Sequence, residues 1–199
     1  MVTMDKAVFL DRDGVINELI YYQEHGIIDS PFTVEQFRLV AGSAEAIRQF
    51  NRKGFKVIVI SNQPGIAKGH LSEEVFENIR QKMNFELAKV GASLDGEYYC
   101  FHHPDAKLER LKIKCQCRKP EPGLLIRAAE EMDIDLSQSW MIGDGITDVM
   151  AGKAAGCKTI LLGRMKCELC QLMDKENARP DAIISNLVEA AEYILGKEV

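Results

Sequence analysis

Two aspartates, Asp11 and Asp13, follow directly after a short apolar run and precede Gly14. Their i, i+2 spacing brings both side chains to the same side of an extended chain, so the two carboxylates can converge on one point. A pair of this kind can hold Mg²⁺, and one of its members can act as a nucleophile. The same residues would also fit an exposed Asp-x-Asp-Gly turn, so the chemistry depends on what the rest of the chain supplies.

Three later segments carry polar groups that suit a phosphate or a metal ion: Ser61 with Asn62, Arg118 with Lys119, and Asp144 with Asp148. The hydroxyl and amide offer neutral hydrogen bonds to phosphate oxygens. The basic pair supplies the positive charge that a phosphoryl group needs. The acidic pair could complete a carboxylate cluster with the first two aspartates. Each segment also has a plainer interpretation, namely a polar turn, a solvated basic pair, and a cap on the helix that follows.

The cysteines form a second constellation. Cys100 and His102 are followed by Cys115 and Cys117, a Cys₃His set of the kind that makes a closed, structural zinc site. Disulfides or free thiols are the alternatives. The remaining pair, Cys167 and Cys170, lacks two further ligands and is more typical of ordinary thiols.

Alternating strands and helices must position these groups. The strands are expected near residues 7–10, 55–60, 98–100, 139–142, 158–162 and 182–184. The helices are expected near residues 42–53, 72–90, 122–132 and 187–195, with a short one ending near 155. Ser43 and Ser72 are the expected caps of the first two helices. This order predicts an α/β fold with a mainly parallel sheet, whose strand ends meet at one edge and can share a site. Residues 18–37 are expected to form an ordered loop over that edge.

Composition sets limits on the class of protein. The chain has 199 residues, of which 46% are hydrophobic and 28% charged, and a net charge of −5. These values predict one globular domain over residues 1–199 that does not bind nucleic acid. No apolar run approaches membrane-spanning length and no signal peptide is evident, so a cytoplasmic location without a membrane partner is expected.

The motifs, taken together, resemble the haloacid dehalogenase (HAD) superfamily. The carrying segments are DRDGVIN at 11–17, SNQPGIA at 61–67, CFHHP at 100–104, CQCRKP at 115–120 and GDGITD at 143–148. Within the superfamily, the chain is similar to the branch of heptose bisphosphate and histidinol-phosphate phosphatases. The resemblance implies a HAD-like modified Rossmann fold with a zinc-binding loop at about 100–117. It covers nearly the whole chain, which leaves no insert large enough for a separate cap domain.

The resemblance also implies a mechanism. Mg²⁺ would be held by Asp11, by the main-chain carbonyl of Asp13 and by Asp144. Asp11 would be the nucleophile that forms an aspartyl-phosphate, and Asp13 would be the general acid and base. Lys119 would pair with Asp11 and with the phosphoryl group, while Ser61 would donate a hydrogen bond to it.

Other residues would bind the substrate or support the site. Asn62, Gln63 and Arg118 are the implied substrate contacts, beside Ser61 and Lys119, and Asp148 would support the water shell of the metal. For the structural zinc, the resemblance favours His102 over the competing His103.

The expected partner is a small phosphorylated metabolite, and the chain is expected to act as a monomer or small homo-oligomer. D-glycero-D-manno-heptose 1,7-bisphosphate is the favoured substrate, and histidinol phosphate or another phosphomonoester is the alternative. A non-catalytic HAD-like binding protein is a more distant alternative, as is a DNA 3′-phosphatase. The loop at 18–37 and Gly145 depart from the pattern of the branch, and the loop is therefore expected to determine which substrate is selected.

Overall fold

Six parallel strands form the central sheet of the protein. The structure, a computed structural model, describes residues 4–163 and 167–197. The sheet has the order β5-β4-β1-β6-β7-β8. Its strands are β1 (Ala7–Leu10), β4 (Lys56–Asn62), β5 (Gly96–Cys100), β6 (Trp140–Gly143), β7 (Lys158–Leu162) and β8 (Ala182–Ile184). The predicted parallel sheet is confirmed, and each predicted strand is present.

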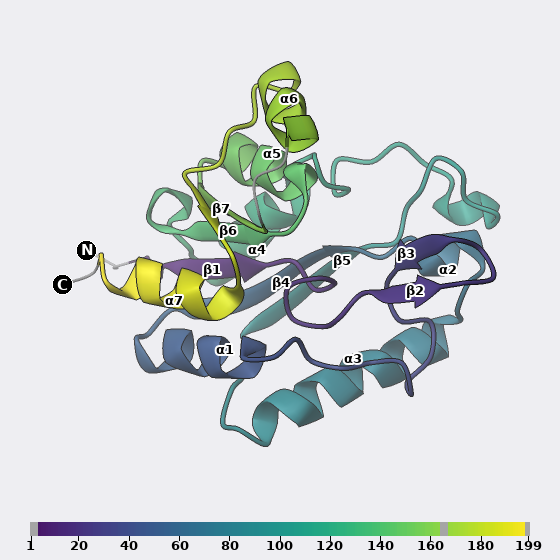
Figure 1. Cartoon of the computed structure of the whole chain (residues 1–199), viewed down its shortest axis with the longest axis horizontal. Helices are drawn as coiled ribbons and strands as arrows, with labels where there is room; N and C mark the ends of the chain where they lie inside the picture. Colours follow the sequence, from purple (N-terminus) through teal and green to yellow (C-terminus); the bar gives the residue numbers. More distant parts are fainter. Residues whose placement is uncertain (1–3, 164–166, 198–199) are drawn as a thin grey trace.

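Helices cover both faces of this sheet (Figure 1). The helices α1 (Ser43–Arg52), α3 (Glu73–Ala88) and α7 (Leu187–Leu195) lie below it in the view, and α4 (Gly123–Met132) and α5 (Ile146–Ala155) lie above it. The shorter or peripheral helical segments are α2 (Gly65–Lys68), α6 (Cys167–Lys175), η1 (Glu109–Leu111) and η2 (Leu136–Gln138). Among the described helices, none is both long enough and apolar enough to cross a membrane.

The central strand β1 is fully buried because both of its faces are covered. Val8 and Leu10 point into the core that contains Phe50 of α1. Ala7 and Phe9 point to the opposite side, into a second core formed with α4 and α5. This alternation explains why the strand is a continuous apolar run in the sequence. It also fixes the point at which the chain leaves the sheet, directly before Asp11.

The first helix shows one wrong prediction. Ser43 does not cap α1, because the preceding Gly42 occupies the cap position. The Ser43 side chain is buried and donates its hydroxyl to the carbonyl of Ile16, 3.0 Å away. The cap predicted for α3 is confirmed, since the Ser72 hydroxyl accepts a hydrogen bond of 3.2 Å from the N–H of Val75.

The segment after β1 contains a hairpin, where a loop was predicted. The strands β2 (Ile20–Tyr22) and β3 (Ile27–Asp29) pair in antiparallel register. The Tyr22 ring stacks on Phe32 with 4.4 Å between centroids. The two ends of the segment are tied together, because the N–H of Glu18 donates to the carbonyl of Arg38 over 2.9 Å. The expectation that this segment is ordered is therefore confirmed.

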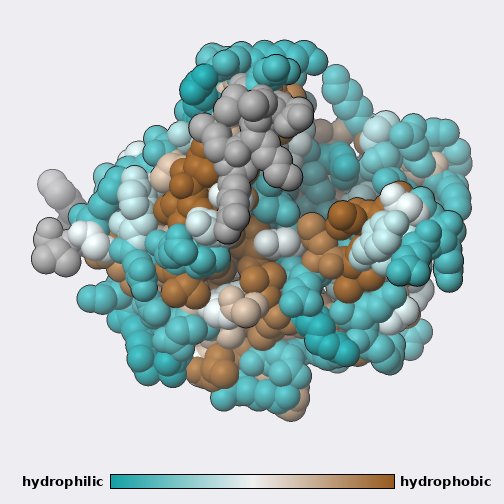
Figure 2. Space-filling model, viewed as in Figure 1, coloured by the Kyte–Doolittle hydropathy of each residue, from teal (hydrophilic) through white to brown (hydrophobic). Residues whose placement is uncertain are grey.

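The hairpin has an unusual surface. Apolar residues gather over it in the space-filling view (Figure 2), and Tyr21 and Ile28 are 60% and 68% exposed. Figure 1 places the hairpin on the side of the molecule to which the sheet strands run. The partly apolar surface of the β2–β3 hairpin thus adjoins the strand ends that carry the candidate site.

The packing of α5 on the sheet generates a stability prediction. A Cβ at Gly152 would lie 2.7 Å from side-chain atoms of both Met141 and Thr159. We expect Gly152→Ala to destabilise the protein by about 1–3 kcal/mol through overpacking, although alanine favours helix formation at an unrestricted site. Chemical denaturation measures the change in the free energy of unfolding.

The matched control for this test is Ala154→Gly, which changes an exposed position of the same helix. It should cost about 1 kcal/mol through helix propensity alone. A Gly152→Ala protein more stable than the wild type would contradict the packing argument.

Candidate active site

The predicted site residues converge at the carboxyl ends of three neighbouring strands. Several of them line a cavity of about 230 Å³. The residues that line it on the sheet side are Asp11, Asp13, Ser61, Asn62, Arg118 and Asp144. Leu19, Ile28, Asp29 and Ser30 of the hairpin segment form the other wall. The interpretation of Asp11 and Asp13 as an isolated exposed turn is therefore wrong.

A buried lysine lies at the centre of the site. The Nζ atom of Lys119 is 3.0 Å from Asp11 Oδ1, 2.6 Å from Asp148 Oδ1 and 2.8 Å from the carbonyl oxygen of Ile60. Burial lowers the pKa of Lys119, but the charges of Asp11 and Asp148 outweigh this effect and the pKa is raised. The lysine therefore stays charged beside Asp11.

Asp148 is fully buried. Its second oxygen, Oδ2, accepts a hydrogen bond of 3.0 Å from the N–H of Gly145, the residue before α5. The interpretation of Asp148 as a cap on the following helix is thus confirmed. Its burial excludes a solvated side chain. Burial raises the pKa of Asp148 to about 6 despite the contact with Lys119.

Asp144 lies closest to solvent among these carboxylates. Its side chain passes over Gly14, where a Cβ would lie 2.1 Å from Asp144 Oδ2. Gly14 also has a φ of 80°, so both space and backbone conformation require glycine here. Although the residue as a whole is exposed, its carboxyl group faces the protein. Desolvation, followed by the charges of Asp11 and Asp148, raises the pKa of Asp144 to about 7.

The carboxylate cluster fits a divalent cation. Oxygen atoms of Asp11, Asp144 and Asp148 lie within 4.8 Å of one another. Lys119 contacts two of these carboxylates, Asp11 and Asp148, and burial followed by the neighbouring negative charges raises the pKa values of Asp144 and Asp148, which a bound cation would offset. Carboxylate oxygens are the ligands that Mg²⁺ prefers. The residues present therefore suit Mg²⁺.

Asp13 is held by a different set of partners. Its carboxylate accepts hydrogen bonds from Arg12, from Asn17 Nδ2 over 2.9 Å and from Gln63 Nε2 over 2.5 Å. Asp11 and Asp13 therefore have distinct environments. Asp11 lies beside the lysine, whereas Asp13 is bound by one guanidinium group and two side-chain amides. Arg12 and Asn17 were not predicted as site residues. A signal for Arg12 was available in the sequence. Arg12 stands between two aspartates that share one side of an extended chain, so its own side chain must point to the other side.

Ser61 and Asn62 lie at the end of β4, inside the strand where a turn was predicted. The Ser61 hydroxyl is buried and accepts a hydrogen bond of 3.1 Å from Gln63 Nε2. The Asn62 side chain binds the main chain of Lys119 twice, donating to its carbonyl and accepting from its N–H, each over 3.0 Å. Asn62 thus fixes the position of the lysine. Gln63 is buried behind Asp13 and does not line the cavity.

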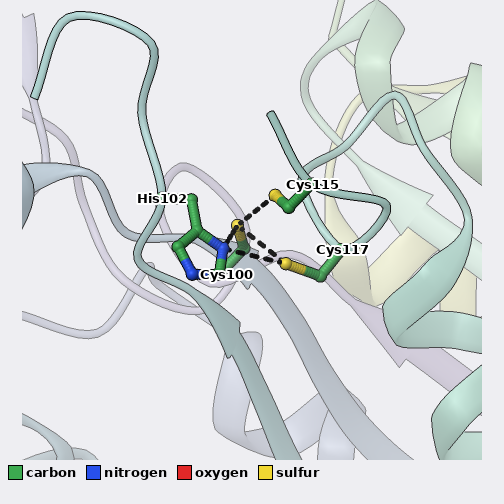
Figure 3. A group of neighbouring side chains, drawn as sticks. All are labelled: Cys100, His102, Cys115 and Cys117. Atoms are coloured by element: carbon green, nitrogen blue, oxygen red, sulfur yellow. Dashed lines mark hydrogen bonds between the residues drawn. The ribbon is translucent and has the colours of Figure 1, made fainter. Parts of the chain in front are cut away.

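The predicted zinc ligands also converge (Figure 3). Sγ of Cys100 lies 3.6 Å from that of Cys115 and 3.3 Å from that of Cys117, and Cys117 Sγ lies 3.3 Å from His102 Nδ1. These separations approach the edge of about 3.8 Å between sulfur ligands of tetrahedral zinc and far exceed a disulfide bond of about 2.05 Å. The three thiols are free. The cluster fits a metal site, and burial raises the pKa of the Cys100 thiol, so that an ion would be needed to hold it as thiolate.

The cluster adjoins the cavity. Arg118, which lines the cavity, donates from Nη1 to the carbonyl of His102 over 3.2 Å. His103 does not belong to the cluster, because its Nδ1 accepts a hydrogen bond from the N–H of Asp105. The side chains of Cys167 and Cys170 lie outside the described part of the structure.

A larger cavity of about 520 Å³ lies elsewhere, between α3, β5 and η1. It is lined by aromatic residues such as Phe76 and Tyr99, and by ion pairs such as that of Arg80 with Glu97. None of the predicted site residues lines it. The smaller cavity carries the chemistry.

Comparison with known proteins yields a family. A family model described as HAD-hydrolase-like matches residues 116–190. A D-glycero-beta-D-manno-heptose-1,7-bisphosphate 7-phosphatase of Pasteurella multocida is 42% identical over 159 residues, which are 80% of this chain and 82% of that protein. The protein of the same name from Escherichia coli (strain K12) is 36% identical over 188 residues, 94% of this chain and 93% of that protein.

A solved structure extends the comparison to three dimensions. The D,D-heptose 1,7-bisphosphate phosphatase from B. bronchiseptica, complexed with magnesium and phosphate, superposes with a TM-score of 0.78 at 28% identity. The match covers 96% of this chain and 99% of that one. The shared fold, the extent of sequence identity and the converging aspartates and lysine lead to one conclusion: this chain belongs to the HAD superfamily, in the family of the heptose bisphosphate phosphatases.

Proposed function

We propose that the protein is a Mg²⁺-dependent phosphatase that removes the 7-phosphate of D-glycero-D-manno-heptose 1,7-bisphosphate. The observation that carries the proposal is the ion pair of 3.0 Å between the buried Lys119 and Asp11, which lines a cavity together with Asp13 and Ser61. The relatives from P. multocida and E. coli, whose names state this activity, support the substrate. Asp11, Asp144 and the main-chain carbonyl of Asp13 would hold Mg²⁺, and Asp148 would support the water shell of the ion.

The attack on phosphorus is assigned to Asp11. Its Oδ1 atom accepts a hydrogen bond of 2.7 Å from the N–H of Arg12 and faces Lys119 Nζ. Both contacts use the same oxygen, which leaves Oδ2 as the attacking atom. The product of this step is an aspartyl-phosphate, which water then hydrolyses. Bound Mg²⁺ neutralises the phosphoryl oxygens and reduces their repulsion of the Asp11 carboxylate.

Two further residues act on the phosphoryl group and the leaving oxygen. Asp13 protonates the departing alkoxide and then accepts a proton from the attacking water. Ser61 already accepts a hydrogen bond from Gln63, so its own O–H remains available to donate to a phosphoryl oxygen. Asn62 acts on the substrate only through the Lys119 backbone.

The Cys₃His cluster is proposed to bind a structural zinc ion through Cys100, His102, Cys115 and Cys117. Its role is to order the segment that carries Arg118 and Lys119 to the cavity. Arg118 follows Cys117 directly and Lys119 comes one residue later, and the polar loop before Cys115 has two buried apolar residues among those described, Ala106 and Leu111. The metal would therefore act as scaffold without contacting substrate.

Substrate choice is assigned to the hairpin segment and to Arg118, which both line the cavity. The substrate is a small phosphorylated metabolite, and we propose that the chain acts as one hydrolase domain over residues 1–199. The central sheet supports this assignment, because it draws strands from residue 7 to residue 184.

The first test measures phosphate release from heptose 1,7-bisphosphate, sugar monophosphates and histidinol phosphate. We expect the heptose bisphosphate to have the highest kcat/KM and EDTA to abolish the reaction. Asp11→Asn should lose at least about 10³-fold in kcat, because the attacking carboxylate is removed. Preference for histidinol phosphate would contradict the substrate assignment, and full activity of Asp11→Asn would contradict the mechanism.

The raised pKa of Asp144, about 7, predicts a pH dependence of Mg²⁺ binding. Protons compete with the ion below that pH, so binding should be about thirty-fold weaker at about pH 5.5 than at about pH 8. In the absence of the ion, ionising Asp144 costs folding stability, which should fall as the pH rises from 3.8 to about 7. Mg²⁺ should therefore raise the melting temperature more at the higher pH.

The control for this prediction is Asp144→Asn, which removes the titrating group. Its melting temperature should respond weakly to Mg²⁺ at both pH values. An equal Mg²⁺ effect at both pH values in the wild type would refute the role of Asp144.

Metal analysis tests the zinc proposal. The purified protein should contain about one zinc ion per chain, and Cys115→Ser should lower this content and the melting temperature. Cys157→Ser is the matched control, because Cys157 is a buried free thiol that does not belong to the Cys₃His cluster. Protein without zinc, or equal zinc loss in both variants, would exclude the site.

A further inference from the structure

We infer that Arg12 is a positioning residue, which holds the Asp13 carboxyl group in the orientation required for proton transfer. The inference rests on the proposed role of Asp13 as general acid. Arg12 lies between the two catalytic aspartates in the sequence, but its side chain points away from the cavity and is 1% exposed.

The contact between Arg12 and Asp13 has two points. Nε of Arg12 lies 3.3 Å from both carboxylate oxygens of Asp13, and Nη2 lies 3.0 Å from Oδ1. A planar guanidinium that meets a carboxylate edge to edge fixes the plane of the carboxylate as well as its position. A single point contact would leave the carboxyl group free to rotate.

Gln63 closes this contact into a ring. Nη2 of Arg12 donates to Gln63 Oε1 over 2.9 Å, and Gln63 Nε2 donates back to Asp13 Oδ2 over 2.5 Å. Each of the three side chains thus contacts the other two. Asn17 adds a donor to Oδ1 from a third direction.

Aromatic packing keeps the guanidinium in place. Its central carbon lies 5.4 Å from the centroid of the Phe76 ring. Phe76 in turn packs edge-on against Tyr99 and Phe101, with centroids 4.9 and 5.1 Å away. Arg12 is therefore packed against an aromatic cluster as well as hydrogen-bonded to Asp13.

This arrangement is costly for stability. The guanidinium is fully buried, and its Nη1 atom has no hydrogen-bond partner among the described residues. Buried ion pairs are often no more stabilising than apolar side chains of similar volume. The benefit of this arginine is therefore best sought in the orientation of Asp13.

A misoriented acid affects some substrates more than others. A sugar phosphate releases a strongly basic alkoxide, so its departure depends on proton transfer from Asp13. An aryl phosphate such as p-nitrophenyl phosphate releases a weakly basic phenolate that departs without it. Loss of the positioning contact should consequently slow the first reaction far more than the second.

The test compares Arg12→Met and Arg12→Lys with the wild type in single-turnover reactions on heptose 1,7-bisphosphate and on p-nitrophenyl phosphate. We expect the sugar-phosphate rate to fall about ten- to hundred-fold and the aryl-phosphate rate by less than about three-fold, with the concentration that gives half of the maximal single-turnover rate nearly unchanged. Arg12→Lys keeps the buried charge but lacks the planar fork, and it should show the same selectivity. It also keeps the proposal testable if Arg12→Met does not fold.

Two controls separate this inference from the function on which it rests. Asp13→Asn should show the same dependence on the leaving group; if it does not, the general-acid assignment fails and the inference fails with it. Arg80→Met removes another arginine, ion-paired with Glu97 outside the site, and should leave the ratio of the two rates unchanged. If Asp13→Asn is selective but the Arg12 variants lose both rates equally, or neither, the inference alone is overturned.

Discussion

A single buried ammonium group, Lys119 Nζ, lies between the carboxylates of Asp11 and Asp148, and the site depends on this contact. Moving a charge into the protein interior is costly unless opposite charges compensate it. Here three segments supply the compensation: Asp11 follows β1, Asp148 lies in the first turn of α5, after β6, and the carbonyl of Ile60 belongs to β4. The three segments can satisfy the lysine only when the sheet order places β1 between β4 and β6. Fold and electrostatics therefore specify the same arrangement.

The position of the lysine is set from two sides. On the sheet side, the Asn62 amide binds both main-chain polar groups of Lys119. On the loop side, Cys117 holds the chain two residues earlier within the Cys₃His cluster (Figure 3). The backbone of this long and flexible side chain is thereby held in place, which reduces the conformational freedom that the side chain must lose when it binds a phosphoryl group.

The sequence was sufficient for those features that depend on local pattern or on strand ends. The apolar run before Asp11, the polar pair after Ile60 and the motif after Ile142 each indicate the carboxyl end of a buried strand, although β4 continues through the polar pair, and parallel topology then brings them together. The Cys-x-His and Cys-x-Cys pairs converge as predicted. The contacts of Arg12 with Gln63 and of Ser43 with Ile16 could not be predicted, because these partners lie 51 and 27 positions away in the chain. The β2–β3 hairpin was missed because its strands have three residues each, too few to show an alternating pattern.

The hairpin segment begins and ends at almost the same place. Glu18 and Arg38 share a main-chain hydrogen bond, and Asn17 bridges to Leu39, so the chain returns to its point of departure before it enters α1. Phe37 is buried in the core, but most of the chain between these residues lies outside it. The entropy of closing such a loop changes slowly with its length, by about 0.6 kcal/mol for each doubling. Insertions, deletions and sequence changes in this segment can therefore reshape the wall opposite Arg118 at small thermodynamic cost, while the aspartates and the lysine stay in place. The fold therefore separates the residues that break the phosphate ester bond from the hairpin segment, which can change without displacing them.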